Sequence, residues 1–101
     1  MEIRVLQYFL TIAREQSISG AAEFLHITQP TLSRQMKELE EELGKQLFIR
    51  GNRKITLTDD GMLLRKRAEE IIQLVEKTES EMNTDTTEFN SAIYIDDGET
   101  E

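Results

Sequence analysis

Residues 19–58 read SGAAEFLHITQPTLSRQMKELEEELGKQLFIRGNRKITLT, and this stretch decides the fold. A short segment with two adjacent alanines comes first, followed by a turn at His26-Ile27 and a longer amphipathic segment that starts after Thr28. A basic segment around Gly51 then lies between two β-prone runs. This order of helix, turn, helix and hairpin predicts a winged helix-turn-helix, with a three-helix core and a two-stranded wing.

The segment after Thr28 carries signals for both ends of a helix. Thr28 can cap the N-terminus, and Pro30 falls in the first turn, where its missing N–H is not needed. Gly44 is typical of the residue just past a helix end. Polar side chains occupy the outer face near the start, whereas four glutamates within Glu38–Glu42 occupy the far end and are expected to be solvated. The buried stripe should consist of Leu32, Met36, Leu39 and Leu43.

The flanking elements complete the predicted domain. Residues 2–15 have helical apolar spacing, and Ser19 is expected to cap a second helix. In that helix the small Ala21 and Ala22 allow a close helix crossing. The expected strands of the wing are Leu47–Arg50 and Ile55–Thr58, around the turn Gly51-Asn52-Arg53-Lys54.

A fourth helix is predicted to start after Thr58 and to run to residue 83. Asp59 and Asp60 in its first turn suit the positive end of the helix dipole. A twenty-residue stripe is about 30 Å long, which is more than the small domain can cover. We therefore favour a dimer interface over an intramolecular core. The stripe, at four-three spacing, comprises Leu64, Ala68, Ile71, Val75, Thr78 and Met82.

The net charge of −8 is unevenly distributed along the 101 residues. Residues 1–58 carry eight Lys or Arg and seven Asp or Glu, whereas residues 80–101 carry seven acidic residues and no basic one. A DNA-facing surface within residues 1–58 is therefore compatible with the negative total charge. Attraction to DNA depends on the electrostatic potential at that surface and not on the net charge of the whole chain. Residues 84–101 are expected to be a disordered, polar linker. The linker contains a β-prone run at Ile93–Ile95 that would begin a domain this chain lacks, followed by an acidic end.

The composition excludes several classes of protein. The chain has no cysteine, so disulfides and thiolate metal sites are absent and a cytoplasmic location is expected. No apolar run is long enough for a membrane span or a signal peptide. His26 is the single histidine, and no metal, cofactor or catalytic group is expected.

Two sets of residues are the candidates for contact with DNA. Base edges are expected to meet the start of the third helix, because Arg can fork onto guanine and Gln can pair with adenine. The alternative for that face is an ordinary solvated surface, and the sequence does not separate base contacts from phosphate contacts. The wing would meet phosphates or the minor groove, unless it is only a solubilising hairpin tip. The base-reading candidates are Gln29, Thr31, Ser33 and Arg34, and the backbone candidates are Thr28, Pro30, Lys37, Arg50, Arg53 and Lys54.

Some basic residues have weaker assignments. Lys37 and Lys45 could each reach phosphate or could simply be solvated. Arg65, Lys66 and Arg67 could also reach DNA, although charges that flank a coiled-coil stripe have the same appearance.

From Leu6 to Gly61 the sequence resembles the DNA-binding domain of the LysR-type transcriptional regulators. The resemblance implies that the fourth helix is a linker helix through which two subunits dimerise. It also implies a two-lobed effector domain after it, which would hold a small-molecule co-inducer, and a tetramer for the full-length protein. The matching residues are Phe9, Ala21-Ala22, Leu25, Gln29-Pro30, Leu32-Ser33-Arg34-Gln35, Leu39-Glu40, Leu43-Gly44, Leu47-Phe48, Arg50, Arg53, Leu57-Thr58 and Gly61.

The leading hypothesis is a dimeric regulator that binds a double-stranded DNA operator. The domains would be residues 1–58 for DNA binding, 59–83 for the linker helix and 84–101 for the truncated remainder. A protein–protein interaction module is the alternative, favoured by the negative total charge and opposed by the basic wing. An enzyme is excluded because the chain has no nucleophile–base pair and no phosphate-binding glycine loop.

Overall fold

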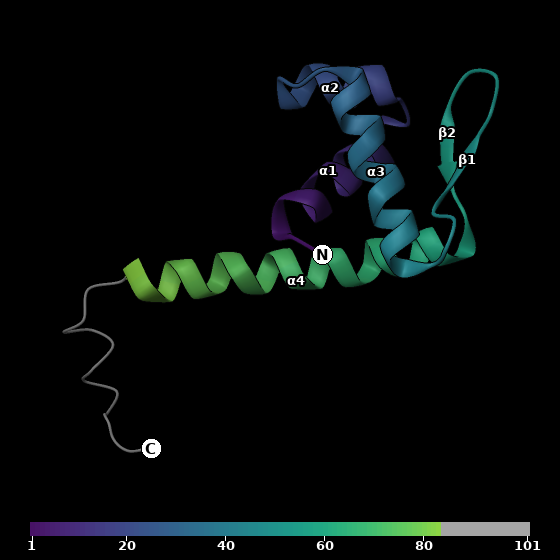
Figure 1. Cartoon of the computed structure of the whole chain (residues 1–101). Helices are drawn as coiled ribbons and strands as arrows, with labels where there is room; N and C mark the ends of the chain where they lie inside the picture. The colour runs from purple at the N-terminus through teal and green to yellow at the C-terminus, as the bar shows by residue number, and fades with distance from the viewer. Residues whose placement is uncertain (84–101) are drawn as a thin grey trace, which may run out of the picture.

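The computed structural model describes residues 1–83, which form four helices and one antiparallel pair of strands (Figure 1). The predicted fold class, a mainly helical winged helix-turn-helix with a long last helix, is confirmed. The predicted linker and strand within residues 84–101 lie outside the described residues. In chain order the elements are α1 (Ile3–Glu15), α2 (Ile18–Leu25), α3 (Gln29–Leu43), β1 (Phe48–Arg50), β2 (Ile55–Leu57) and α4 (Asp59–Asn83).

One apolar core holds the three helices and the wing together. Phe9 of α1 is at its centre, and its ring lies 5.4 Å from that of Phe48 in β1, at a tilted angle that aromatic pairs favour. Leu43 is half-buried at the edge of this core, whereas the rest of the predicted α3 stripe is fully buried. The core residues are Val5, Phe9, Ile12, Ala21, Ala22, Leu32, Met36, Leu39, Leu47, Phe48 and Ile55.

The corner between α1 and α2 is tighter than the sequence suggests. Gln16 ends α1 in the left-handed region at φ 57°, and its N–H donates to the carbonyl of Ile12 at 2.7 Å. This sharp turn lets α2 begin at Ile18, so the capping oxygen belongs to Ser17, which accepts from the N–H of Gly20 at 3.0 Å. The prediction that Ser19 caps this helix was therefore wrong by two residues.

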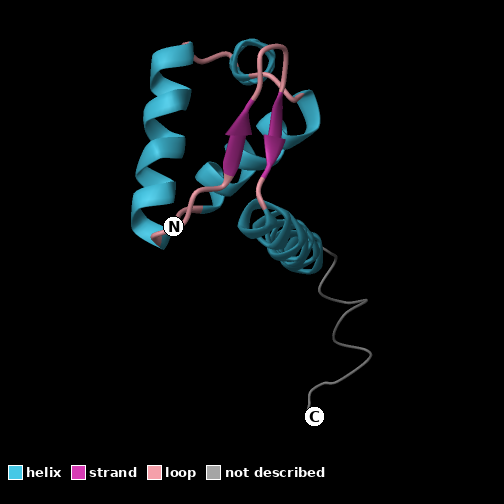
Figure 2. Ribbon diagram, turned by 90° about the vertical axis from the view of Figure 1, so that its right-hand side faces the viewer, coloured by secondary structure: helices cyan, strands magenta, loops and turns pink. Residues whose placement is uncertain are grey.

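The wing is an antiparallel hairpin that stands beside the helices (Figure 2). Phe48 pairs with Leu57, and Arg50 pairs with Ile55. Each strand is one residue shorter than predicted at the base of the hairpin, although Thr58 still donates its N–H to the carbonyl of Leu47 at 3.0 Å. The N–H of Ile55 donates to the carbonyl of Gln16 at 3.0 Å, which fastens the wing to the corner between α1 and α2.

The wing and the start of α4 are tightly packed where they meet. The Thr58 hydroxyl accepts from the N–H of Gly61 at 3.0 Å, as predicted for a cap, and also donates to the carbonyl of Gln46 at 2.6 Å. A Cβ on Gly61 would collide with the carbonyl oxygen of Leu47. Only glycine at this position lets α4 begin directly against the base of the wing.

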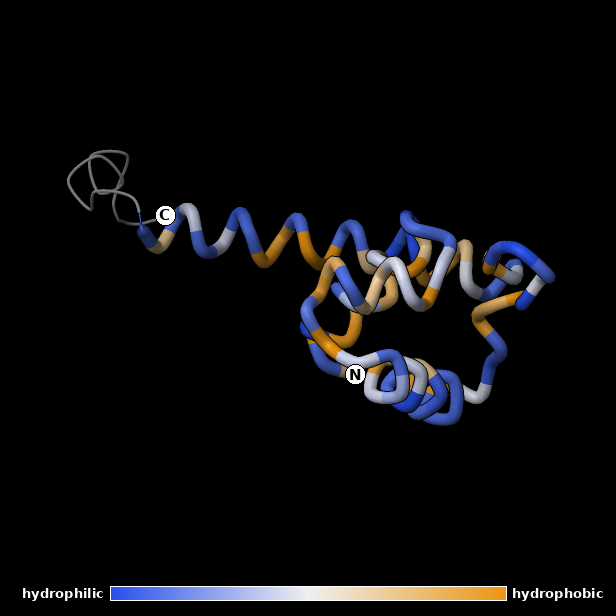
Figure 3. The backbone as a smooth tube through the Cα atoms, turned by 90° about the horizontal axis from the view of Figure 1, so that it is seen from above, coloured by the Kyte–Doolittle hydropathy of each residue, from blue (hydrophilic) through white to orange (hydrophobic). Residues whose placement is uncertain are grey.

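Helix α4 passes under the domain and extends well beyond it (Figures 1 and 3). Its 25 residues correspond to about 37 Å. The first part of the predicted dimer stripe packs within the chain, because Ala68 is 0% exposed and Leu64 is half-buried against the core. Ala68 therefore has no exposed surface to offer a partner, whereas the role of half-buried Leu64 in dimerisation remains a prediction.

The distal part of the stripe is more open. Ile71 and Val75 are half-buried, and Met82 is 77% exposed. Their role in dimerisation remains a prediction. Within residues 1–83, the helices are too short or too polar to cross a membrane.

Candidate nucleic-acid interface

The turn between α2 and α3 sets the direction of α3. His26 adopts the left-handed region at φ 60° and ends α2, and its N–H donates to the carbonyl of Glu23 at 3.2 Å. The N–H of Ile27 donates to the carbonyl of Ala22 at 3.0 Å, so the last carbonyls of α2 are satisfied. The side chain of His26 is exposed, so its part in the turn is played by its backbone.

The first turn of α3 is fixed by its cap. The Thr28 hydroxyl accepts from the N–H of Thr31 at 3.4 Å and donates to the hydroxyl of Thr31 at 2.9 Å. Pro30 occupies the first turn, as predicted. Because the hydroxyls of Thr28 and Thr31 bind each other, both are partly committed to the cap.

The predicted contact residues of α3 share one exposed face. Gln29 and Lys37 are exposed and Ser33 is half-buried, and their four-residue spacing places them above one another along the helix. Pro30 and Arg34 form the adjacent row and are both exposed. Thr31 is half-buried, as Ser33 is, but its hydroxyl is bound by the Thr28 cap, which makes it the weakest of the four predicted base-reading residues.

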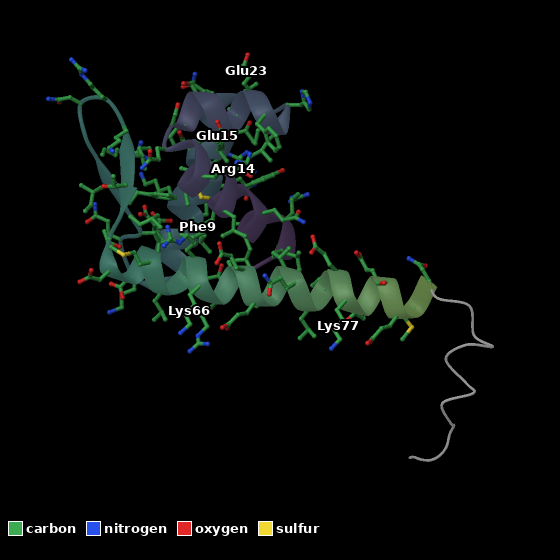
Figure 4. The ribbon with its side chains drawn as sticks, turned by 180° about the vertical axis from the view of Figure 1, so that it is seen from behind. Phe9, Arg14, Glu15, Glu23, Lys66 and Lys77 are labelled. Carbon is green, nitrogen blue, oxygen red and sulfur yellow. The ribbon has the colours of Figure 1, made fainter. Side chains whose placement is uncertain are left out.

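The wing carries three exposed cations around a tight tip. Gly51 donates its N–H to the carbonyl of Lys54 at 3.0 Å, which closes the turn. Arg50, Arg53 and Lys54 are all exposed, and none of them lies within ion-pair distance of a carboxylate among the described residues. Side chains ending in nitrogen project from the tip of the hairpin (Figure 4).

A polar groove joins α3 to the wing. Gln29 from the start of α3 lines it together with Arg53 and Lys54 from the wing tip. Ser17 and Ser19 at the start of α2 line the same groove. The structure thus brings together candidates that are more than twenty positions apart in the sequence.

The start of α2 was missed as part of this site. Gln16, Ser17 and Ser19 line the groove, and the first N–H groups of α2 lie at the same end. A helix N-terminus with hydroxyl side chains favours anionic groups such as phosphates. The available signal in the sequence is the pair Ser17 and Ser19, of which only Ser19 was given a role, as a helix cap.

The cations of the site differ in their partners. Arg34 has a carboxylate within ion-pair distance, Glu38 Oε2 at 3.7 Å from its Nη1. Lys37, like the wing cations, has none among residues 1–83. The cations that are predicted to meet phosphates are therefore without a carboxylate partner in this part of the chain, whereas the predicted base-reading arginine is paired.

Other charged residues are not part of one surface. Lys66 points away from the domain on the outer side of α4 (Figure 4), whereas Arg65 lines a groove with Arg14 of α1. Arg67 pairs with Glu70 at 2.9 Å. The three-residue basic cluster is therefore split between faces.

One glutamate of the acidic run has a structural role that the sequence did not show. Glu40 is half-buried, and its Oε2 accepts from the N–H of Leu47 at 2.7 Å. This contact fixes the end of α3 to the start of the wing. No group of three or more metal-ligating side chains occurs among residues 1–83.

Comparison with known proteins identifies similar sequences and folds. Residues 3–62 match the family model described as the bacterial regulatory helix-turn-helix protein, lysR family. The HTH-type transcriptional regulator BsdA of Bacillus subtilis (strain 168) is 54% identical over 77 residues, which are 75% of this chain and 27% of BsdA. The chain spans about a quarter of the length of the curated relatives it matches.

Solved structures with bound DNA have the same architecture. The BenM_DBD/catB site 1 DNA complex matches with a TM-score of 0.76 and 44% identity, over 79% of this chain and 86% of that one. The CbnR_DBD-DNA complex matches with a TM-score of 0.77 and 36% identity, over 81% of this chain and 94% of that one.

Proposed function

The chain belongs to the lysR family of bacterial regulatory helix-turn-helix proteins, and from this premise we propose that it binds a double-stranded DNA operator and regulates transcription. The observation that carries the proposal is the groove shared by Gln29, Arg53 and Lys54, with uncompensated cations at its wing end. The relatives BenM and CbnR have DNA-binding domains of this fold that were solved with DNA. Such a target would place the protein in the cytoplasm.

On the exposed face of α3, some residues would contact base edges and others would contact the DNA backbone. Gln29, Ser33 and Arg34 would enter the major groove, with Thr31 at its margin, because a helix fits that groove and presents its N-terminal residues to base edges. Thr28, Pro30 and Lys37 would lie against the flanking backbone. The glutamates at the other end of α3 favour this orientation, since phosphates would repel them.

The wing would meet the DNA beside the helix. Arg50, Arg53 and Lys54 can neutralise phosphates, and Arg53 can enter the minor groove from the tip of the hairpin. The start of α2 adds Ser17 and Ser19, which line the same groove. Each phosphate contact adds to affinity for any sequence, whereas α3 supplies the preference for one sequence.

The distal part of α4 is the proposed dimer interface, through Ile71, Val75 and Met82. These three residues lie on the side of α4 opposite Lys66 and Lys77, at four-three spacing, which suits the seam between two paired helices.

A twofold dimer predicts the layout of the operator. Two copies of α3 would enter successive major grooves on one face of the duplex, about 34–36 Å apart or a multiple of that distance. The site should therefore be a pseudo-palindrome. A tetramer and a small-molecule co-inducer are proposals for a protein that carries the effector domain of the family.

Selection of bound duplexes from a random DNA pool tests the proposal. We expect enrichment of one pseudo-palindromic motif whose half-sites are separated by one helical turn or a multiple. Enrichment of a single, non-repeated half-site would contradict the dimer and leave DNA recognition intact. A pool that stays random after repeated rounds would contradict sequence-specific binding.

A further inference from the structure

Glu40 binds the loop between α3 and the wing at two points. Its main-chain carbonyl accepts from the N–H of Lys45 at 3.1 Å, and its side-chain Oε2 accepts from the N–H of Leu47 at 2.7 Å. Leu47 is 1% exposed, so water has little access to replace the carboxylate at this N–H. A hydrogen bond from a backbone N–H to a carboxylate is also stronger than one to a neutral acceptor. The side chain of Glu40 is therefore a firm partner for the residue that precedes β1.

The contact at Leu47 continues into the second strand and into α4. The Leu47 carbonyl accepts from the N–H of Thr58 at 3.0 Å. The Thr58 hydroxyl in turn accepts from the N–H of Gly61 at 3.0 Å, in the first turn of α4. Glu40 thus begins a series of hydrogen bonds that runs from α3 across the base of the wing to α4.

Among residues 1–83, hydrogen bonds attach the wing to the preceding helices at two places. The N–H of Ile55 donates to the carbonyl of Gln16, and at the base of the wing the N–H of Leu47 donates to Glu40. The first acceptor is a main-chain carbonyl, which any amino acid at position 16 would supply. The second acceptor is a side chain, so a substitution at position 40 can remove it.

We infer that Glu40 is a positioning residue for the wing, whose carboxylate sets where the wing cations lie relative to α3. The inference rests on the proposed function, because these cations are proposed to contact DNA phosphates. Arg53 and Lys54 line one groove with Gln29 of α3, and their separation from α3 has to match that between a major groove and the adjacent backbone. Without the carboxylate, the buried N–H of Leu47 needs another acceptor, and the base of the wing has to shift to reach one.

Loss of this contact should change DNA binding in a specific way. Phosphate contacts from the wing add affinity for every sequence, whereas the start of α3 supplies the preference for one sequence. Glu40 lies about three helical turns after Gln29, so the cap and the first turn of α3 stay intact. Substitution of Glu40 should therefore weaken binding to different duplexes alike and leave the ratio of their affinities unchanged.

Glu41 provides a matched control. It follows Glu40 on α3, is exposed, and has no side-chain hydrogen bond or ion pair among residues 1–83. Glu40→Ala and Glu41→Ala remove the same charge, and only the first removes the acceptor for Leu47. Glu40→Gln removes the charge but keeps an acceptor oxygen on a side chain of the same length.

The test is a fluorescence anisotropy titration of each variant on the duplex enriched by selection and on a scrambled duplex of the same length and composition. At about 0.15 M salt we expect Glu40→Ala to bind both duplexes about fivefold more weakly than Glu41→Ala, which is the counterion-release contribution of one phosphate contact. The slope of log affinity against log salt should be smaller by about 0.9. Glu40→Gln should bind like Glu41→Gln, because its amide oxygen can still accept from Leu47.

A double-mutant cycle separates positioning of the wing from general destabilisation. In an Arg53→Ala/Lys54→Ala background, the wing lacks the two cations that Glu40 is inferred to position. The difference between Glu40→Ala and Glu41→Ala should therefore disappear in that background, whereas a loss of folded protein would persist in it. Circular dichroism at the temperature of the titration measures the folded fraction of each variant.

Glu40→Asp keeps the experiment decisive if Glu40→Ala does not fold. It retains the negative charge but ends one methylene short of Leu47, and it should weaken binding relative to wild type with the same smaller salt slope. Wild-type binding by Glu40→Asp would then overturn the role of Glu40.

The outcomes separate this inference from the proposed function. Equal binding by folded Glu40→Ala and Glu41→Ala, or a difference that persists in the Arg53→Ala/Lys54→Ala background, would refute the positioning role while wild-type binding stands. Equal affinity of the wild type for the selected and the scrambled duplex would instead refute the proposed function itself.

Discussion

The domain formed by α1–α3 and the wing contrasts with the distal half of α4. In the domain, apolar side chains from four elements close on Phe9, and hydrogen bonds fasten the wing to both ends of the helical unit. The distal half of α4 has exposed apolar side chains, with Leu74 at 64% and Met82 at 77% exposure. The apolar side chains of the first region are covered within the chain, whereas the apolar face of the second is exposed and is the face that we propose a second copy covers.

The stability of the domain should depend most strongly on the ring of Phe9 at the centre of the core. Phe9→Ala removes a fully buried side chain and its contact with Phe48, and should lower the free energy of unfolding by about 3–5 kcal/mol. Phe24→Ala is the control, because Phe24 is 58% exposed and touches Arg14 at the surface, 4.4 Å from guanidinium carbon to ring centroid. Urea unfolding curves measure both variants, and similar losses would show that the core is not centred on Phe9.

A substitution at the junction between the wing and α4 should give the next largest loss of stability. Gly61→Ala places a Cβ against the carbonyl oxygen of Leu47 and should cost about 2–3 kcal/mol through the forced shift of α4 from the wing. Gly20→Ala is the matched control. A Cβ there meets the Ser17 side chain at an ordinary 3.4 Å, so the helix-favouring alanine should leave stability equal or higher. A Gly61→Ala protein as stable as wild type would show that the junction is not tight.

A substitution on the proposed DNA-binding surface should lower DNA affinity without loss of stability. Arg34→Ala removes an exposed side chain that is expected to fork onto guanine, and should weaken binding to the selected duplex by about 1–3 kcal/mol. Discrimination against a scrambled duplex should fall with it. An unchanged isotherm at unchanged melting temperature would remove Arg34 from the base-reading set.

The distal half of α4 should give the smallest effect on folding and a clear effect on association. Val75→Glu puts a charge at a half-buried position of the proposed interface, and should change the stability of the protomer by less than about 1 kcal/mol. Sedimentation should show loss of the dimer. Lys77→Glu reverses a charge on the outer side of α4 (Figure 4) and should leave the dimer intact. A Val75→Glu dimer of normal strength would place the interface elsewhere.

The features that were predictable from sequence are those with local causes. Thr28 and Pro30 mark the start of α3 because cap and ring act within one turn, and Thr58 marks α4 for the same reason. The buried residues of α3 followed from helical spacing. Misplacing the α2 cap at Ser19 came from the left-handed conformation of Gln16, which no residue preference announces.

The remaining features depend on contacts between distant segments. A stripe at four-three spacing is the same whether it faces a partner or the chain's own core, so burial of Ala68 under α1 was not visible in it. The hydrogen bond from Leu47 to Glu40 and the groove that unites Ser17, Gln29 and Arg53 are likewise products of packing. Most residues of the candidate DNA surface were predicted from the sequence. The start of α2 was recognised only from its position in the fold.

The most direct test of the central claim is a fluorescence anisotropy titration of the wild-type protein at two salt concentrations, with the selected and the scrambled duplex. The claim is that the face of α3 reads the sequence while the wing cations neutralise phosphates. It predicts tighter binding to the selected duplex at both salt concentrations and a marked weakening on both duplexes at the higher one, since neutralised phosphates release counterions. Binding that does not change with salt, or that is equal for the two duplexes, would contradict it.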